Sequence, residues 1–324
     1  MTSATPLLRP GLPAVLIEAF TGVPCRGNGA GVVLLDQPVQ AAWMQAIARS
    51  LRQSETAFLV PWQGEWLLRW FTPSCEVPLC GHATLAALLA LSHWGLLGEG
   101  ELTHVHTRSG ALPMQGLRRP MADQAGMGLI ELPGGELIPA AVPERLAHLL
   151  NNALGVAALR FWRSELGYAV TLLPADAPLA TMPSLAPDLD DELGRGLVVM
   201  QATGSASARP EPEAASPGQD AAGDLEQQAD YRLRFFAPAL GIPEDPVTGS
   251  AHALVARWWQ QQLGRSRVVG WQCSDRPGGL VSEGGPSGMI RLTGLGVLLW
   301  DGHLNAQPPV CAPGSDWPRP GSAV

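Results

Sequence analysis

Hydrophobic residues occur along this chain mostly in short runs that turn residues separate, and a few longer stretches have helical spacing. Short runs rich in β-branched and aromatic side chains predict strands. Apolar residues that recur every three or four positions predict helices. We therefore predict a mixed α and β fold with many hairpins. The predicted strands are 15–19, 31–35, 55–60, 65–71, 102–106, 127–132, 168–173, 197–201, 231–236, 268–273, 288–292 and 297–300, and the predicted helices are 41–50, 81–94, 143–150 and 250–262.

A short internal repeat indicates two comparable halves. Residues 68–73 read LRWFTP and residues 233–238 read LRFFAP, and each segment ends a predicted strand at a proline. Gly81 opens the helix that follows the first segment, and Gly249 opens the helix that follows the second. Both helices are apolar around most of their circumference, which is typical of helices enclosed on all sides. We predict an α+β fold with two pseudo-twofold-related halves, each with one buried helix, and a cleft where the two helix starts meet.

The composition along the chain sets the predicted boundaries. We expect a flexible N-terminus over 1–13, an N-terminal half over 14–133 that a strand near 295–305 completes, and a C-terminal half over 134–294. The segment 204–230 contains one large apolar residue, Leu225, and is rich in Ala, Ser, Pro, Glu and Gln. Such a composition buries too little surface to offset the entropy of ordering it. We expect a disordered insertion there and a disordered proline-rich tail over 306–324.

Charge and composition exclude several functions. The chain has 324 residues and a formal net charge of -8, and all 21 of its basic residues are Arg. Without Lys, neither a side-chain Schiff base nor a lysine-dependent phosphate loop can form. The negative charge disfavours nucleic acid as a partner. Five cysteines without C-x-x-C spacing suggest neither a disulfide framework nor a structural zinc site. No apolar run is long enough for a membrane span, so we expect no membrane partner and a soluble cytoplasmic protein.

The predicted cleft has features of an anion site. A glycine at a helix start lets a ligand approach the backbone, where free N–H groups and the positive end of the helix dipole favour an anion. Two such starts, at Gly81 and Gly249, would suit a small carboxylate. The alternative is that both glycines only permit tight turns, which is the better interpretation for one glycine alone. The occurrence of two such glycines at matching helix starts favours a binding site over two tight turns.

Three titratable residues lie near these helix starts in the sequence. Glu55 precedes an apolar run, and partial burial would raise its pKa and suit it to proton transfer. His82 follows Gly81, where the helix dipole would keep the imidazole neutral. Asp245 precedes a proline shortly before Gly249. Taken singly, Glu55 and Asp245 could serve as cap or turn residues and His82 as an ordinary helix-start residue. Only their clustering argues for catalysis.

Other signals are weaker. The glycine-rich run 27–31 lacks the final glycine of the dinucleotide-binding fingerprint and precedes a strand, so no nicotinamide site is indicated. His104 and His106 would share one face of a strand and could bind a metal, but no third ligand follows from the spacing, so a structural or surface role is favoured. The chain has no G-x-S-x-G motif, which removes the nucleophile of one hydrolase class.

The motifs together resemble the phenazine-biosynthesis isomerase family (PhzF-like), which has the diaminopimelate-epimerase-like fold. The resemblance covers about residues 14–305, and its two glycine–helix motifs are specific in combination. It departs from the family at Gly29, where Pro is usual, at Pro277, and in the 204–230 insertion. The first two departures would reshape the cleft wall and therefore do not favour a phenazine-precursor substrate. The matching segments are 20–28, 54–58 (SETAF), 71–73, 80–84 (CGHAT), 241–252 (GIPEDPVTGSAH), 272–274 and 278–280.

The resemblance implies two halves, each a barrel-like curved, mostly antiparallel sheet around a central helix. It also implies an isomerase without cofactor or metal, commonly a homodimer. Glu55 would be the general acid/base that moves a proton on a small, cyclic or acyclic, carboxylate substrate. His82 and Asp245 would position the substrate and share the proton chemistry. The substrate's polar end would bind at the following residues: Gly81, Thr248, Gly249 and Ser250.

Two other functions stay open at this point. Racemases and epimerases of this fold use two thiols, and here Cys80 stands at the first place but Thr248 at the second. A hydroxyl is far too weak a base to replace a thiolate, so epimerisation is disfavoured and Cys80 is expected to be a packed, inert thiol. The other alternative is a non-catalytic binding or scaffold protein that uses the insertion to dock a partner.

Overall fold

The computed structural model describes residues 11–190, 192–204, 221–308 and 317–318. Its helices are α1 (Ala41–Leu51), α2 (Gly81–His93), α3 (Glu144–Leu154), α4 (Ala221–Gln228) and α5 (Gly249–Leu263). Its strands are β1 (Leu12–Ala19), β2 (Asn28–Leu34), β3 (Glu55–Trp62), β4 (Glu65–Phe71), β5 (Glu76–Val77), β6 (Leu102–Thr107), β7 (Gly110–Arg118), β8 (Gly126–Pro133), β9 (Leu137–Pro139), β10 (Arg160–Ser164), β11 (Ala169–Leu172), β12 (Leu197–Ala202), β13 (Tyr231–Ala237), β14 (Ile242–Asp245), β15 (Arg267–Gln272), β16 (Gly278–Gly284) and β17 (Met289–Leu304).

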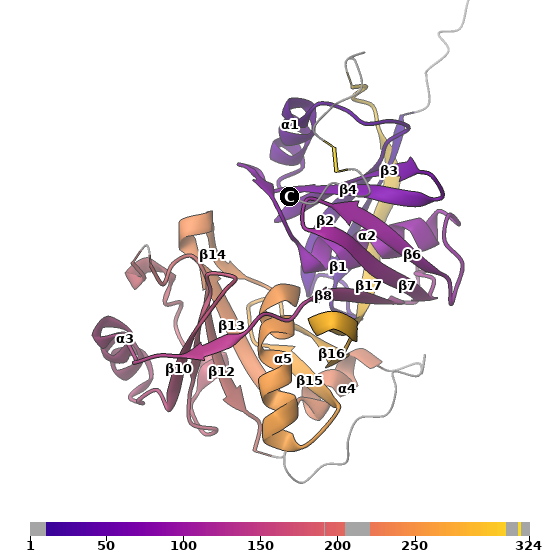
Figure 1. Cartoon of the computed structure of the whole chain (residues 1–324). Helices are drawn as coiled ribbons and strands as arrows, with labels where there is room; N and C mark the ends of the chain where they lie inside the picture. The colour runs from indigo at the N-terminus through magenta and orange to yellow at the C-terminus, as the bar shows by residue number, and fades with distance from the viewer. Residues whose placement is uncertain (1–10, 191, 205–220, 309–316, 319–324) are drawn as a thin grey trace, which may run out of the picture.

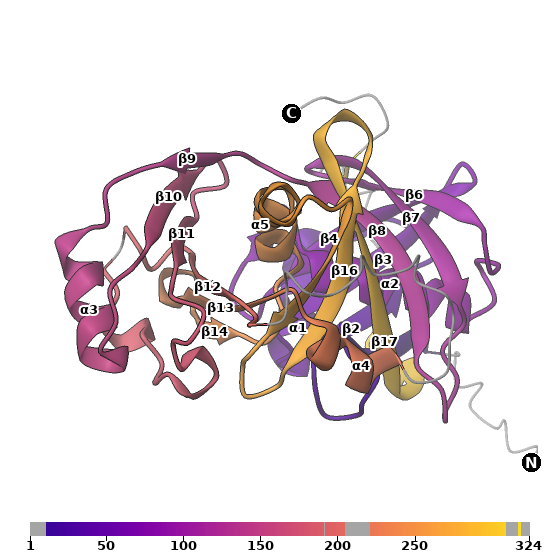
Figure 2. The same cartoon turned by 90° about the horizontal axis from the view of Figure 1, so that it is seen from below.

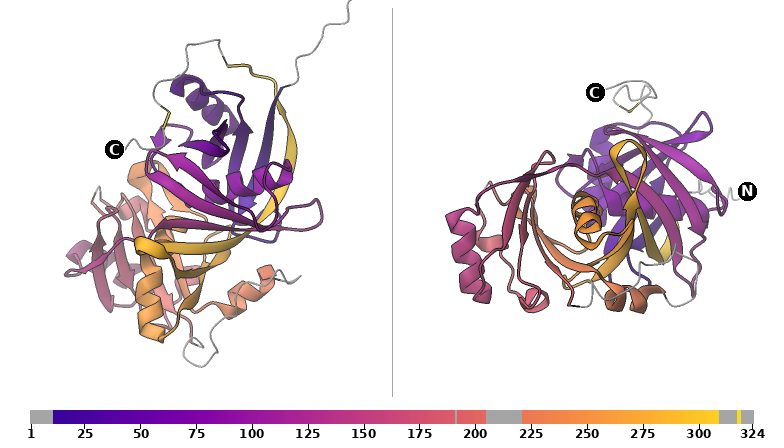
Figure 3. Two further views of the ribbon diagram at one scale, coloured as in Figure 1. Left: turned by 45° about the vertical axis from the view of Figure 1, so that its right-hand side comes forward. Right: turned by 60° about the horizontal axis from the view of Figure 1, so that its bottom comes forward.

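The first part of the chain forms a closed ring of strands around α2 (Figures 1 and 3). The ring runs β1, β2, β3, β4, β6, β7, β8 and β17, and β17 pairs with β1 to close it. Every residue of α2 from Gly81 to Ser92 is buried, and the helix contacts strands on several sides of the ring. The Ala and Leu residues around this helix therefore all meet apolar side chains. This burial fixes where the helix begins.

The second part of the chain repeats the pairing order of the first. β2 pairs in parallel with β3, and β4 in parallel with β6; β11 pairs in parallel with β12, and β13 in parallel with β15. In each part the short strand, β5 or β14, comes directly before the helix, α2 or α5. Figure 2 shows α5 between the strands β10 to β13 on one side and β16 and β17 on the other. The two helices consequently occupy equivalent places in the two strand orders.

The C-terminal strand differs from the prediction in length. Residues 288–292 and 297–300 were predicted as two strands, but β17 is continuous and pairs with β8, β16 and β1. Gly294 and Gly296 lie between the two predicted segments. A Cβ at Gly294 would lie 2.6 Å from Phe20, and one at Gly296 would lie 2.4 Å from Leu89 of α2. These glycines are needed because the strand passes close to the buried helix.

Part of each segment predicted to be disordered is ordered. Within 204–230, residues 205–220 lie outside the described residues, but α4 is a helix whose Leu225 packs with Ala229, Trp271 and Cys273. Within 306–324, residues 309–316 and 319–324 lie outside the described residues, but Trp317 is buried and donates a hydrogen bond to the Val39 carbonyl oxygen (2.8 Å). The prediction was wrong at these two places because a single large side chain is enough to anchor a segment to an existing core. For the predicted flexible segment 1–13, residues 1–10 lie outside the described range and β1 begins at Leu12.

Several strands were not predicted. The longer ones are β7, β10 and β16, and the sequences of β7 (GALPMQGLR) and β16 (GGLVSEG) contain glycines or a proline that usually break strands. In the structure both are held by partners on each side. No helix among the described residues is long and apolar enough to cross a membrane.

Candidate active site

The starts of α2 and α5 meet at one point between the two parts of the structure. A Cβ at Gly81 would lie only 3.1 Å from the Cα of Gly249, so neither position accepts a side chain without movement. A cavity of about 390 Å³ opens at this point. Among the described residues, every residue predicted for the site lines this cavity: Glu55, Gly81, His82, Asp245, Thr248, Gly249 and Ser250.

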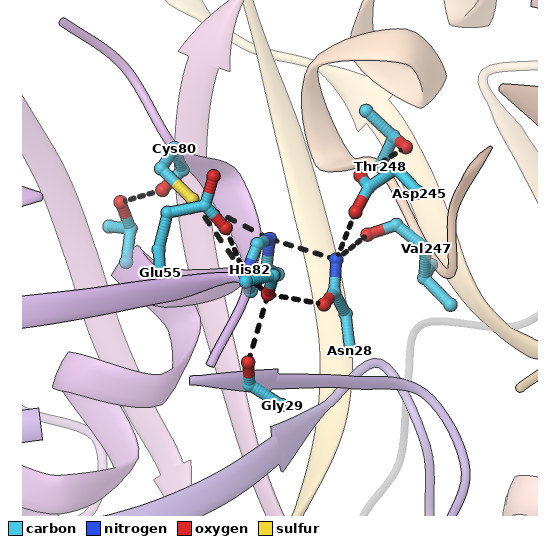
Figure 4. Close-up of polar contacts among 10 residues, drawn as sticks. Asn28, Gly29, Glu55, Cys80, His82, Asp245, Val247 and Thr248 are labelled. Carbon is cyan, nitrogen blue, oxygen red and sulfur yellow. Dashed lines mark hydrogen bonds and ion pairs between the residues drawn. The ribbon is translucent and has the colours of Figure 1, made fainter. Parts of the chain in front are cut away.

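His82 stands at the centre of the polar side chains (Figure 4). Its Nε2 lies 3.0 Å from Glu55 Oε2 and 3.1 Å from the Ser54 hydroxyl. Its Nδ1 lies 3.1 Å from the Asn28 amide nitrogen and 3.5 Å from the Cys80 sulfur. Residues from β2, from β3 and its preceding turn, and from the start of α2 therefore all contact one imidazole ring. The ring cannot turn without breaking several of these contacts.

Asn28 joins the two parts of the structure across the cleft. Its amide group donates to Asp245 Oδ1 (2.7 Å) and to the Val247 carbonyl oxygen (3.0 Å). Its own Oδ1 accepts a hydrogen bond from the Ser54 hydroxyl at 2.9 Å. Asp245 Oδ2 accepts a second hydrogen bond, from the Thr248 hydroxyl at 2.5 Å. Asp245 is thus held by donors on both oxygens and is oriented toward the cavity from the second part of the chain.

The carboxylate of Glu55 is held differently. Its side chain is only 6% exposed, and Oε2 is buried without a hydrogen bond of ordinary geometry from any described residue, although the imidazole of His82 faces it. Buried polar atoms are usually hydrogen-bonded, so an exception needs an explanation. The explanation here is the ion pair with His82, which holds the Glu55 carboxylate at the cavity wall, where it can accept a proton from a bound molecule.

Burial shifts the pKa values of the groups around His82. Burial and the Glu55 carboxylate raise the pKa of the Cys80 thiol to about 11. Burial opposes a charge on His82, but the negative charges that Cys80 and Glu55 can carry outweigh it and raise the His82 pKa well above its usual value. Because the Cys80 thiol is neutral near pH 7, Glu55 is the partner that counts there. The predicted neutral His82 was wrong, since the helix dipole was considered without the carboxylate 3.0 Å away.

The pKa of the Asp245 carboxyl group is raised above that of an ordinary surface carboxyl group. Burial raises its pKa to about 6, the positive charge of His82 lowers it, and the Glu55 charge raises it. The site therefore holds an ion pair, Glu55 with His82, beside a carboxyl group that exchanges its proton near neutral pH. Pairs of groups whose environments shift their pKa values are typical of acid–base sites.

Comparison with known proteins places this geometry in a family. A family model for phenazine biosynthesis-like proteins, PhzC-PhzF, matches residues 17–302. The chain belongs to this phenazine biosynthesis-like family. A relative from Pseudomonas aeruginosa named an uncharacterized isomerase is 35% identical over 292 residues, which cover 89% of this chain and 97% of the relative.

Solved structures agree on the fold. A crystal structure of a PhzF family phenazine biosynthesis protein from Enterococcus faecalis has a TM-score of 0.72 and 27% identity, and the match covers 90% of this chain and 98% of that one. A predicted epimerase from Pseudomonas aeruginosa has a TM-score of 0.63 and 24% identity, covering 91% and 100%. The second comparison shows a shared fold. The PhzF-like and epimerase-like fold expected from the motifs is confirmed at this level.

In this PhzF-like site, one group of described residues has the donors for a metal ion. Donor atoms of Glu55, Cys80 and His82 all lie within 4.8 Å of one another and are buried. A carboxylate, a thiolate and an imidazole are all zinc ligands. Binding would require deprotonation of a thiol whose pKa is about 11 and would take up the Glu55 carboxylate that faces His82. Glu55 cannot hold a metal and accept a proton at the same oxygen at once.

The cavity also has an apolar side. Val77 and Leu79 reach it from β5 and the loop before α2, and Phe235 and Ile242 reach it from β13 and β14. The Tyr168 hydroxyl lies 3.3 Å from the Ser250 hydroxyl at the start of α5. A molecule bound here meets charged groups and helix N-termini on one side and hydrocarbon on the other.

Sequence reasoning missed four polar residues of this site. Asn28 and Ser54 stood in the motifs that carry the resemblance but received no role, and Tyr168 received none either. Gln272 donates to the Asp245 carbonyl oxygen (2.6 Å) and accepts from the Thr248 amide (2.8 Å). Cys80 was expected to be packed and inert. It is buried, but it lines the cavity 3.5 Å from His82.

Proposed function

We propose that this protein is a cofactor-independent isomerase that moves a proton on a small carboxylate substrate, with Glu55 as the general acid/base. The observation that carries the proposal is the buried, cavity-lining carboxylate of Glu55, which the His82 imidazole contacts at 3.0 Å. The family and the relative named an isomerase support the reaction class. The apolar wall of the cavity supports a substrate that has a hydrocarbon or ring portion.

In the proposed step one carboxylate removes and returns a proton, and the proton on Glu55 exchanges with solvent between the two transfers. Glu55 takes a proton from a carbon of the substrate, and the electron pair left behind shifts along a conjugated system. Glu55 then returns a proton at another position, so that one double bond moves and no redox partner is needed. The His82 imidazolium, 3.0 Å from Glu55, stabilises negative charge before and after the transfer. Asp245, with a pKa of about 6, can supply or accept a proton at a heteroatom of the substrate.

The two helix starts would bind the substrate's carboxylate. Free backbone N–H groups and the positive dipole ends at Gly81 and Gly249 favour an anion. The hydroxyl of Ser250, held by Tyr168, adds a donor beside them. These contacts would place the reacting carbons against Glu55 rather than against the hydrocarbon wall. Positioning of this kind accounts for a large share of enzymatic rate enhancement.

Thr248 argues against an epimerase. Its hydroxyl donates to Asp245 and its amide donates to Gln272, so it serves as an orienting residue. It cannot act as the second base opposite Cys80, because a hydroxyl is far too weak a base near neutral pH. A single carboxylate that both removes and delivers a proton fits these contacts better than two thiols.

We also propose the finer arrangement expected from the motifs. The two halves, 14–133 with the strand near 295–305 and 134–294, would be related by a pseudo-twofold axis, and the protein would act in the cytoplasm as a homodimer. The repeated strand order around α2 and α5 supports the first of these statements. Light scattering of the purified protein tests the dimer.

The test of function separates binding from chemistry. Glu55→Gln keeps the size of the side chain but cannot accept a proton. We expect small cyclic and acyclic hydroxy- and amino-carboxylates that raise the melting temperature of the wild type to do so in the variant, while turnover is lost. Glu136→Gln, at an exposed position outside the cavity, is the matched control. Ligands that bind the wild type without ever being converted would instead favour a non-catalytic binding protein.

A further inference from the structure

Gln272 is a fully buried amide that lies behind the wall of the cavity. It is the last residue of β15, its exposed fraction is 0%, and it does not itself line the cavity. Its Nε2 donates to the Asp245 carbonyl oxygen at 2.6 Å, and its Oε1 accepts from the Thr248 amide at 2.8 Å. One backbone acceptor and one backbone donor therefore fix which end of the side-chain amide faces which group.

The orientation of Gln272 sets the direction of a hydrogen bond at Thr248. Gln272 Nε2 also donates to the Thr248 hydroxyl oxygen, at 3.3 Å. An amide N–H can only donate, so the hydroxyl oxygen accepts there and directs its own proton elsewhere. That proton goes to Asp245 Oδ2, at 2.5 Å. The direction of donation is thus passed from the backbone to Gln272, then to Thr248 and finally to the Asp245 carboxylate.

The start of α5 gives a second observation on Thr248. This residue is the N-cap of α5, a position where a threonine oxygen ordinarily accepts a hydrogen bond from a backbone N–H of the first turn. Here the Thr248 side chain makes no capping bond. Its hydroxyl serves Asp245 instead, and it leaves the first backbone N–H groups of α5 to a bound anion.

The hydrogen bonds determine how Asp245 presents a proton. Asn28 donates to Oδ1 at 2.7 Å and Thr248 donates to Oδ2 at 2.5 Å. Both bonds favour the charged carboxylate and oppose the rise in the Asp245 pKa that burial causes. A proton that Asp245 takes up finds no acceptor in these two partners, because Gln272 keeps Thr248 a donor. The proton is therefore directed toward the cavity that Asp245 lines.

We propose that Gln272 is a positioning residue, which fixes the Thr248 hydroxyl as a donor to Asp245 so that Asp245 exchanges its proton with a bound substrate. The exchange with substrate rests on the proposed function, whereas the order of the hydrogen bonds is a property of the protein alone. A glutamine suits this place because its side chain both donates and accepts. An ionised glutamate would only accept, and an apolar side chain would do neither.

Titration of the Asp245 carboxyl carbon by ¹³C NMR tests the proposal in the full-length protein without substrate. Aspartate labelled at the carboxyl carbon supplies the signal, which is assigned by its loss in Asp245→Asn. Thr248→Val removes the hydroxyl and should raise the midpoint of the titration by about one pH unit. Gln272→Met should raise it by about half a unit. Because Gln272 acts through Thr248, the double variant should not exceed Thr248→Val by more than about 0.3 units.

The charges that face Asp245 are retained in these variants. His82 from α2 and Glu55 from β3 act on its carboxyl group, and Tyr168 faces it from the loop before β11. A shift of the midpoint therefore reports the altered hydrogen bonds. Gln201→Met is the matched control, because Gln201 is also a buried glutamine on a strand but lies outside the cavity, and its Oε1 has no hydrogen-bond donor among the described residues. It should leave the midpoint unchanged.

An unchanged midpoint in Gln272→Met, with folding verified by circular dichroism, overturns the proposal, and so does a double variant in which the two shifts add. If Gln272→Met does not fold, Gln272→Asn decides the matter. It keeps the amide but is one methylene too short to reach both backbone groups, so the midpoint should rise in the same direction.

Turnover separates this proposal from the proposed function. With a carboxylate that the wild type converts, Gln272→Met should lower kcat at least about tenfold and change KM less, because a proton-transfer group is misplaced. If the wild type converts no carboxylate, the proposed function fails, and the titration of Asp245 still decides whether Gln272 sets the hydrogen bonds.

Discussion

Replacing Gly81 with alanine tests whether the contact between the two helix starts sets the geometry of the site. The added methyl group would lie 2.9 Å from Leu132 Cδ1 and 3.1 Å from the Cα of Gly249. Carbon atoms prefer separations of about 3.5–4.0 Å. The leucine methyl can move by a change of rotamer, but the Gly249 backbone can yield only if the start of α5 shifts by about 0.4 Å.

The expected cost to stability is small. Overpacking of this kind costs about 1–3 kcal/mol, and the leucine contact relaxes easily, so we expect a loss near the lower end. For a chain of 324 residues this corresponds to a fall in melting temperature of about 2–3 °C. The expected cost to function is larger. Both helix starts belong to the proposed carboxylate site, and displacements of an ångström cost about a hundredfold in rate.

The assay compares kcat/KM and melting temperature of Gly81→Ala with those of Gly284→Ala. Gly284 is the exposed last residue of β16, and no atom lies within 4 Å of an added Cβ, so its variant should match the wild type in both measurements. For Gly81→Ala we expect kcat/KM to fall at least about tenfold while the protein stays folded. Wild-type kcat/KM in a folded Gly81→Ala protein would refute the reasoning, because the helix starts would then not determine the site.

Three further predictions concern the polar network. Asn28→Ala removes the donor to the Asp245 carboxylate, and hydrogen bonds to charged groups contribute about 1.5–3 kcal/mol to stability. We therefore expect the melting temperature to fall by about 3 °C and turnover to drop. An unchanged melting curve would contradict the bridge that Asn28 forms between the two parts of the structure. Burial raises the pKa of Asp245 from 3.8 to about 6, so between these values the folded protein holds a proton that the unfolded chain has released, and stability should decrease as the pH rises through this window. Urea unfolding of Asp245→Asn should show a flatter dependence between about pH 4 and 6, and a curve parallel to that of the wild type would argue against a buried Asp245. Treatment with a strong chelator should leave turnover unchanged, because Glu55 and His82 are proposed to serve proton transfer rather than to hold a metal together with Cys80; loss of activity that Zn²⁺ restores would overturn this assignment.

Much of the fold could be predicted because the local hydrophobic pattern indicates most of its helices and strands. The four predicted helices and most strands stand where the hydrophobic spacing indicates, and the apolar circumference of α2 corresponds to its complete burial. The exceptions depend on distant contacts. Gly294 and Gly296 allow the close passage of β17 over α2, and Leu225 of α4 packs against Trp271 of β15.

The site also has a part that local motifs predict and a part that depends on distant contacts. Glu55, His82 and Asp245 could be chosen from motifs, but their mutual distances could not. The charge of His82 was misjudged because the Glu55 carboxylate beside it comes from β3, which is distant in sequence. Asn28 received no role because its partner Asp245 lies 217 residues further along the chain. Outside the site, the contact of Glu65 on β4 with His104 and His106 on β6 also follows only from strand register.

Solvent-deuterium incorporation measured by mass spectrometry tests the central claim most directly. The wild type, Glu55→Gln and Glu136→Gln are incubated in D₂O with the carboxylates that bind, including dihydro-hydroxyanthranilate. The proposed proton transfer predicts deuterium at a carbon-bound position with the wild type and Glu136→Gln, and none with Glu55→Gln. Undiminished incorporation with folded Glu55→Gln, or none with the wild type for any carboxylate that binds, would contradict the assignment of Glu55 as the catalytic base.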